Sequence, residues 1–147
     1  MYPVLISVHL LAATIWTGGH IVLFAAVLLP ALRTRDHRRI TDFEQHFEKI
    51  GIPALVTLVV TGFWMASLQL PEVSQWFTLQ SPSSRTVSAK LFLLLITLTL
   101  ALHARLRLIP RLSEKTLPNL AVHITLVTLT SILFALTGVM HRFGGLW

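Results

Sequence analysis

The sequence predicts an all-α integral membrane protein, an up-down-up-down bundle of four helices that forms one domain over residues 1–147. Hydrophobic residues make up 54% of the chain and charged residues only 12%, whereas soluble domains carry roughly 25% charged residues. The mean hydropathy is +0.72. Four apolar runs are each long enough to cross a bilayer, which takes about 20 residues of helix. These three observations exclude a water-soluble globular domain.

The first half of the chain contains two predicted spans separated by a basic loop. The first span covers about residues 4–32 and ends near Arg33. Thr41 and Glu44 have the spacing of a capping box, in which each side chain bonds to the other residue's backbone N–H. This spacing predicts that the second helix begins near its capping residue and spans about residues 42–70.

The second half begins with the longest loop, residues 71–85, in which Trp76 and Phe77 are expected to belong to a segment that rests on the lipid headgroups. The third span covers about residues 86–109. Pro118 suits the first turn of the fourth span, about residues 118–140, because that turn does not need the proline N–H. Short connections between successive spans favour antiparallel neighbours.

The basic residues predict the orientation of the bundle and argue against a nucleic-acid partner. The net charge is +6, but the basic residues flank apolar segments instead of lining a soluble face. Nine follow the first or third span: Arg33, Arg35, Arg38, Arg39, Lys49, Arg105, Arg107, Arg111 and Lys115. Only Arg85, Lys90 and Arg142 lie on the other side. The positive-inside rule then predicts cytoplasmic loops after the first and third spans and both termini on the opposite side. In the bacterial inner membrane, where we expect the protein, that side is the periplasm, and the lipid bilayer is its main partner.

Seven histidines in so apolar a chain are the main chemical signal. An ionisable side chain inside a bilayer is costly, so it usually faces the interior of the bundle. His9, Trp16 and His20 are spaced by seven and four residues and therefore share one face of the first helix. On the fourth helix, His123 and His141 return to the same face.

Distance along each helix, at about 1.5 Å per residue, groups these histidines by depth. His9 and His141 fall in the periplasmic half. Up to four others are expected to form a cluster in the cytoplasmic half: His20, His46, His103 and His123.

Histidines on facing helices of a bundle are typical ligands of haem iron and other metals. The sequence therefore favours one or two b haems held by histidine pairs. The candidate metal ligands are His9, His20, His103 and His123. Room for a flat macrocycle is expected at Gly18, Gly19, Gly51 and Gly62. Cationic partners for the haem propionates are expected among Arg105, Arg107 and Arg111.

Three stretches of sequence resemble the CopD/HemJ group of membrane proteins. They are His9-Leu-Leu-Ala-Ala-Thr-Ile-Trp16-Thr-Gly18-Gly19, Pro53-Ala-Leu-Val-Thr57-Leu-Val-Val-Thr-Gly62-Phe-Trp64, and Lys90-Leu-Phe-Leu-Leu-Leu followed by His103. The resemblance to HemJ implies haem b and protoporphyrinogen oxidation, and the resemblance to CopD implies copper uptake or resistance. It also implies cofactor-binding roles for His9 and Lys90, and Trp16 belongs to the same motif.

Two functions and a structural role remain open from the sequence. The first is a haem b oxidoreductase or electron-transfer protein, HemJ-like or di-haem cytochrome b-like, linked to quinone, superoxide or a porphyrinogen; no catalytic side chain is assigned. The alternative is a CopD-like copper-binding or copper-import protein, because imidazole binds copper well. Against it, the chain has no cysteine and only three methionines. A structural subunit, including a homo-oligomer, would leave the histidine pattern unexplained.

Overall fold

The structure is a computed structural model that describes residues 2–144. Those residues contain helices, turns and short connections, and no strand. Four helical stretches are long and apolar enough to cross a membrane: Tyr2–Thr34, Arg38–Gln69, Pro82–Arg111 and Leu117–Arg142. The predicted all-α fold with four membrane-spanning helices is confirmed. The up-down-up-down order and the single domain over residues 1–147 stay predictions.

The first stretch consists of α1 (Tyr2–Val22), the π-helical turn η1 (Leu23–Leu28) and α2 (Leu29–Thr34). Pro30 lies in the first turn of α2, directly after η1. A proline inside a helix lacks one backbone donor and crowds the preceding turn, and the wider π turn gives room for it. Arg35 then adopts a left-handed conformation with φ of 54° and ends α2.

The second stretch, α3 (Arg38–Gln69), begins earlier than the sequence predicts. The predicted capping box at Thr41 and Glu44 is wrong, because both residues lie inside the helix. The backbone N–H of Arg38 instead donates to the Asp36 carboxylate at 3.2 Å. An acidic side chain at this position satisfies a free N–H group and complements the helix dipole, so the helix starts before Thr41.

The loop after α3 folds inward around a short 3₁₀ helix, η2 (Val73–Phe77). Trp76 is buried, and its indole Nε1–H donates to the carbonyl of Leu70 at 2.9 Å. The Ser88 hydroxyl donates to the backbone carbonyl of Trp76. The prediction of a segment resting on the headgroups is therefore wrong for Trp76, whose polar N–H is satisfied inside the protein, whereas Phe77 is exposed.

The third stretch contains α4 (Pro82–His103), the π-helical turn η3 (Ala104–Leu108) and the 3₁₀ turn η4 (Ile109–Arg111). α4 begins at a capping box formed by Ser81 and Ser84, whose hydroxyls satisfy two backbone N–H groups. The fourth stretch is α5 (Leu117–Arg142), and Pro118 lies in its first turn as predicted.

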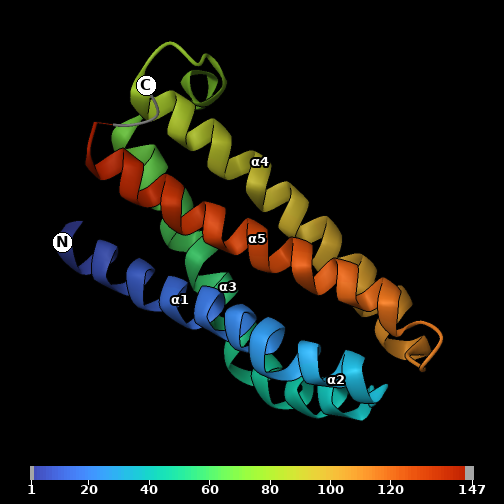
Figure 1. The fold of residues 1–147 in the computed structure, drawn as a ribbon. Helices are drawn as coiled ribbons and strands as arrows, with labels where there is room; N and C mark the ends of the chain where they lie inside the picture. The colour runs from blue at the N-terminus through green and yellow to red at the C-terminus, as the bar shows by residue number, and fades with distance from the viewer. Residues whose placement is uncertain (1, 145–147) are drawn as a thin grey trace.

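The helices pack as a row in the order α3, α1, α5 and α4: α1 lies against both α3 and α5, and α4 lies against α5 (Figure 1). α2 lies at the end opposite the N-terminus, and the C-terminal end of α5 lies near the start of α4. A core of seven buried residues holds the α2 end together: Leu23, Leu28, Ala31, Ile40, Leu117, Leu120 and Ile124. Many other large apolar side chains face outward, as expected for helices surrounded by lipid.

Candidate functional site

One residue from each of four helices gathers at the end of the bundle that carries the start of α1 and the end of α5. These residues are His9 from α1, Thr61 from α3, Lys90 from α4 and His141 from α5. Together they are called the His9 end. Because the residues lie far apart in the sequence, only the packing of all four helices brings them together.

A chain of two hydrogen bonds fixes the proton on the His9 ring. Thr61 Oγ1 lies 2.5 Å from the carbonyl of Thr57 and donates its single hydroxyl hydrogen there. The same Oγ1 lies 2.7 Å from His9 Nδ1 and can therefore only accept a hydrogen bond from it. His9 Nδ1 thus carries the proton in the neutral ring, and Nε2 keeps a lone pair for a ligand. Ligands held in this way have their ring orientation set by a second group.

Lys90 and His141 stand beside His9. The Lys90 ammonium lies within electrostatic range of both histidines. Its Nζ is 3.7 Å from the point that a Cβ on Gly138 would occupy, so Lys90 extends over α5 at its glycine. His141 Nδ1 is buried and has no hydrogen-bond partner among residues 2–144. Such a nitrogen is rare in a protein interior, and it is free to bond to a ligand, an ion or a water molecule.

A second pair of histidines lies toward the α2 end, where α4 meets α5. His103 Nδ1 and His123 Nε2 are 2.8 Å apart, and the two rings lie 4.9 Å apart with an angle of 34° between their planes. His103 is exposed and His123 is partly buried. This pair is called the His103 end.

His20 and Trp16 lie in the middle of the bundle and belong to neither pair. Both side chains are buried, and His20 Nδ1 donates to the carbonyl of Trp16 at 2.8 Å. The His20 ring meets the Phe47 ring edge-on at 5.6 Å. The Thr128 hydroxyl donates to the backbone carbonyl of His20, so this region joins α1 to α3 and α5 mainly by packing.

The predicted cytoplasmic cluster of up to four histidines is not assembled. No three His, Cys, Asp or Glu residues of the described part of the chain gather in a way that could hold a metal ion. His103 contacts His123, while His20 bonds to its own helix. His46 is exposed, and its Nδ1 donates to the carbonyl of Asp42 on the same helix.

The glycines that were expected to leave room for a macrocycle play different roles. The Phe47 ring occupies the space beside Gly19 and Gly51, and a Cβ on Gly19 would overlap that ring. Gly62 faces His9, whose Cε1 lies 3.5 Å from the point where its Cβ would be. Gly18 has open space beside it. The space between α1 and α3 beside Gly19 is therefore filled by the ring of Phe47 and not by a macrocycle.

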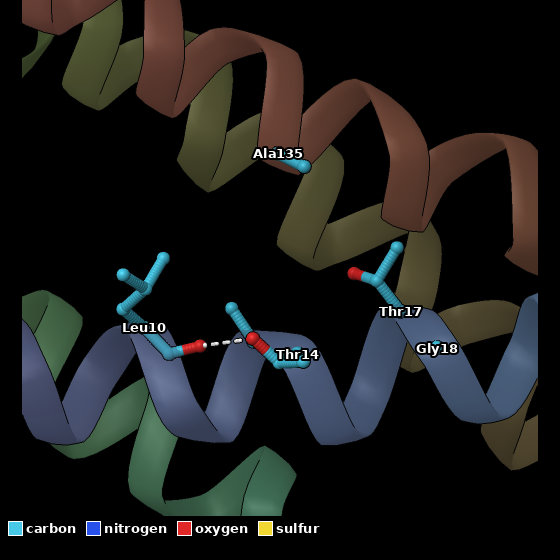
Figure 2. Close-up of a pocket in the computed structure, with 6 residues that line it drawn as sticks. Leu10, Thr14, Thr17, Gly18 and Ala135 are labelled. Atoms are coloured by element: carbon cyan, nitrogen blue, oxygen red, sulfur yellow. Dashed lines mark hydrogen bonds between the residues drawn. The ribbon is translucent and has the colours of Figure 1, made fainter.

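Two open grooves run along α1, and neither contains a histidine. The first, of about 250 Å³, lies between α1 and α5, where Leu10, Thr14 and Thr17 face Ala135 (Figure 2). The second, of about 380 Å³, lies between α1 and α3 and includes Lys49. Haem needs an axial imidazole at the edge of an apolar slot. These grooves do not provide one, and the cationic partner expected for a propionate, Arg105, pairs with Glu48 at 2.5 Å.

Sequence reasoning did not find the groups that orient the histidines. Thr61 holds His9, and the backbone carbonyl of Asn119 holds His123 Nδ1 at 3.0 Å. Thr57 and Thr61 are four residues apart, the spacing that lets one threonine hydroxyl reach the other residue's carbonyl on a helix. A threonine pair of this kind beside Gly62 was a usable signal for a site on α3.

The comparisons with known proteins agree with this arrangement at the level of the family. The family model of copper resistance protein D (CopD) matches residues 41–141, which cover all of α4 and nearly all of α3 and α5. No curated protein and no solved structure matches the chain. The CopD match covers well over half of the sequence and confirms the resemblance to that family, although the first motif, with His9 and Trp16, lies outside the matched residues. The chain is a multi-pass membrane protein that belongs to the copper resistance protein D family.

Proposed function

We propose that the protein binds copper ions within the membrane and passes them across it, and that His9 and His141 form its first binding site. One observation carries the proposal: the His9–Thr61–Thr57 hydrogen bonds leave His9 Nε2 with a free lone pair, and the unpartnered Nδ1 of His141 lies at the same end of the bundle, with Lys90 in range of both rings. Imidazole nitrogens are suitable copper ligands. The family match to copper resistance protein D supports copper as the cargo.

Lys90 limits how tightly this site holds a cation. An ammonium group in a medium of low dielectric constant repels a nearby metal ion far more strongly than it would in water. A transport site must bind its ion well enough to capture it and weakly enough to release it. Lys90 lowers the affinity of this site for copper, because it lies within range of both histidines and makes no ion pair among residues 2–144.

Haem b is the competing hypothesis. The residues present do not fit it, because the grooves along α1 contain no histidine and the only hydrogen-bonded histidine pair in the described range leaves no space between its rings. A copper ion needs no such slot. Quinone or porphyrin as a partner and an assembly of several copies both stay open.

The proposal is tested by copper uptake into vesicles that contain the purified full chain and a trapped, membrane-impermeant Cu(I) chelator. Because each substitution removes one ligand, His9→Ala and His141→Ala are each expected to slow uptake by roughly tenfold or more. His37→Ala is the matched control, since His37 lies in the connection between α2 and α3, at the end of the bundle opposite the His9 end. Uptake that is unchanged in both ligand variants contradicts the proposal. A strong haem absorption band in protein purified from haem-replete cells supports the competing hypothesis.

A further inference from the structure

The two imidazoles at the His103 end are linked by a single proton. His123 Nδ1 lies 3.0 Å from the carbonyl of Asn119, which can only accept, so Nδ1 carries the proton of the neutral His123 ring. His123 Nε2 therefore has a free lone pair. It lies 2.8 Å from His103 Nδ1, which must be the donor between the two rings.

We infer that this pair is a second copper site, in which a Cu(I) ion takes the place of the shared proton and binds His103 Nδ1 and His123 Nε2. His123 is already in the tautomer that a ligand needs, because the Asn119 carbonyl keeps Nδ1 protonated and leaves Nε2 free. Histidines that bind metals generally donate their other ring N–H to a neighbouring group in this way. His103 must move its proton from Nδ1 to Nε2. The proton changes place within the His103 ring, so no net proton is released.

The local structure allows the pair to open. Two metal–nitrogen bonds of about 2.0 Å on opposite sides of an ion need about 4 Å between the nitrogens, whereas these nitrogens are 2.8 Å apart. His103 is the last residue of α4, and the π-helical turn η3 follows it directly. Turns of this kind are frequent at functional sites. The His103 side chain is exposed at this junction, so its ring can rotate away from His123 without displacing a buried side chain.

The number of ligands selects the metal. No third His, Cys, Asp or Glu joins the pair within residues 2–144. Zn²⁺ in proteins is almost always bound by four ligands in a tetrahedron, whereas Cu(I) is stable with two nitrogen ligands in a line. The site therefore takes Cu(I) in preference to Zn²⁺. This inference rests on the proposed function only in assuming that the bound ion is copper.

The test is an anaerobic titration of the purified full chain with Cu(I) against a coloured Cu(I) chelator. Wild-type protein is expected to bind two Cu(I) ions, and His103→Ala and His123→Ala one each. His46→Ala is the matched control and keeps both, because His46 is exposed and bonds to the carbonyl four residues before it, as His123 does, but has no partner histidine. The His103 side chain is exposed, so its loss leaves the core intact.

A His9→Ala variant separates this inference from the proposed function. It is expected to keep one Cu(I), with two nitrogen neighbours by X-ray absorption, and to exclude Zn²⁺ at the same concentration. If His9→Ala and wild type bind the same single ion and His103→Ala binds none, the His9 site is refuted and the His103 site stands. If His103→Ala keeps two ions, or Zn²⁺ fills the pair as readily as Cu(I), the inference is overturned.

Discussion

At the His9 end a threonine from a neighbouring helix holds a single imidazole beside a cation, whereas at the His103 end two imidazoles from neighbouring helices hold each other. At both ends, one ring nitrogen of a histidine donates a hydrogen bond to a neighbouring oxygen that can only accept it. This bond fixes which nitrogen of the ring carries the proton. The difference lies in charge. Lys90, which has no ion-pair partner among residues 2–144, stands at the first end, whereas the cation near the second pair, Arg105, is paired with Glu48.

This difference in charge predicts different affinities for Cu(I) at the two ends. A pair of neutral imidazoles without a nearby ammonium group holds Cu(I) more tightly than a pair beside one, because like charges repel strongly where water is scarce. The His9 end is then the weaker site and the His103 end the tighter one. An ion would move from weak to tight binding along the bundle.

The largest change is expected from Thr61→Val, which breaks the hydrogen bond that orients His9. In a His103→Ala background, where only the His9 end binds, Cu(I) affinity should fall by about 10- to 100-fold, the usual cost of losing such a group. The matched control is Thr130→Val, because Thr130 is equally buried, at 6% exposure, and also bonds a carbonyl of its own helix. Equal affinities for the two variants in competition titrations would show that Thr61 does not position the ligand.

A smaller change of opposite sign is expected from Lys90→Gln. Removal of the positive charge should tighten Cu(I) binding at the His9 end by about tenfold at low salt, since that charge lies within range of both histidines. The His103 end should keep its affinity, which serves as the internal control. Weaker binding in the variant would mean that the Lys90 nitrogen is itself a ligand. The positive charge of Lys90 would then not explain a difference in affinity between the two ends.

The four spans could be predicted from hydropathy because a bilayer forces each backbone to bond within its own segment. Depth along a helix also placed His9 and His141 at the same end of the bundle, where both lie within range of Lys90. The partner of His103 could not be predicted in this way, because depth says nothing about which helices are neighbours. α4 lies against α5 and not extensively against α1, so His103 meets His123 and not His20. The start of α3 was missed for a local reason, the Asp36 carboxylate.

The smallest effect is expected from the ion pair between Arg105 and Glu48, which ties η3 to α3 near the His103 end. The arginine side chain is 57% exposed and the glutamate 31%, so Glu48→Gln should lower the free energy of unfolding by about 0–1 kcal/mol. Thermal unfolding in detergent at low and high salt measures it, and the difference from wild type should shrink as salt rises. Neither residue contacts His103 or His123 through a hydrogen bond, so Cu(I) stoichiometry should stay at the wild-type value. A lost ion in Glu48→Gln would mean that the pair of imidazoles depends on the position of α3 and is not held by α4 and α5 alone.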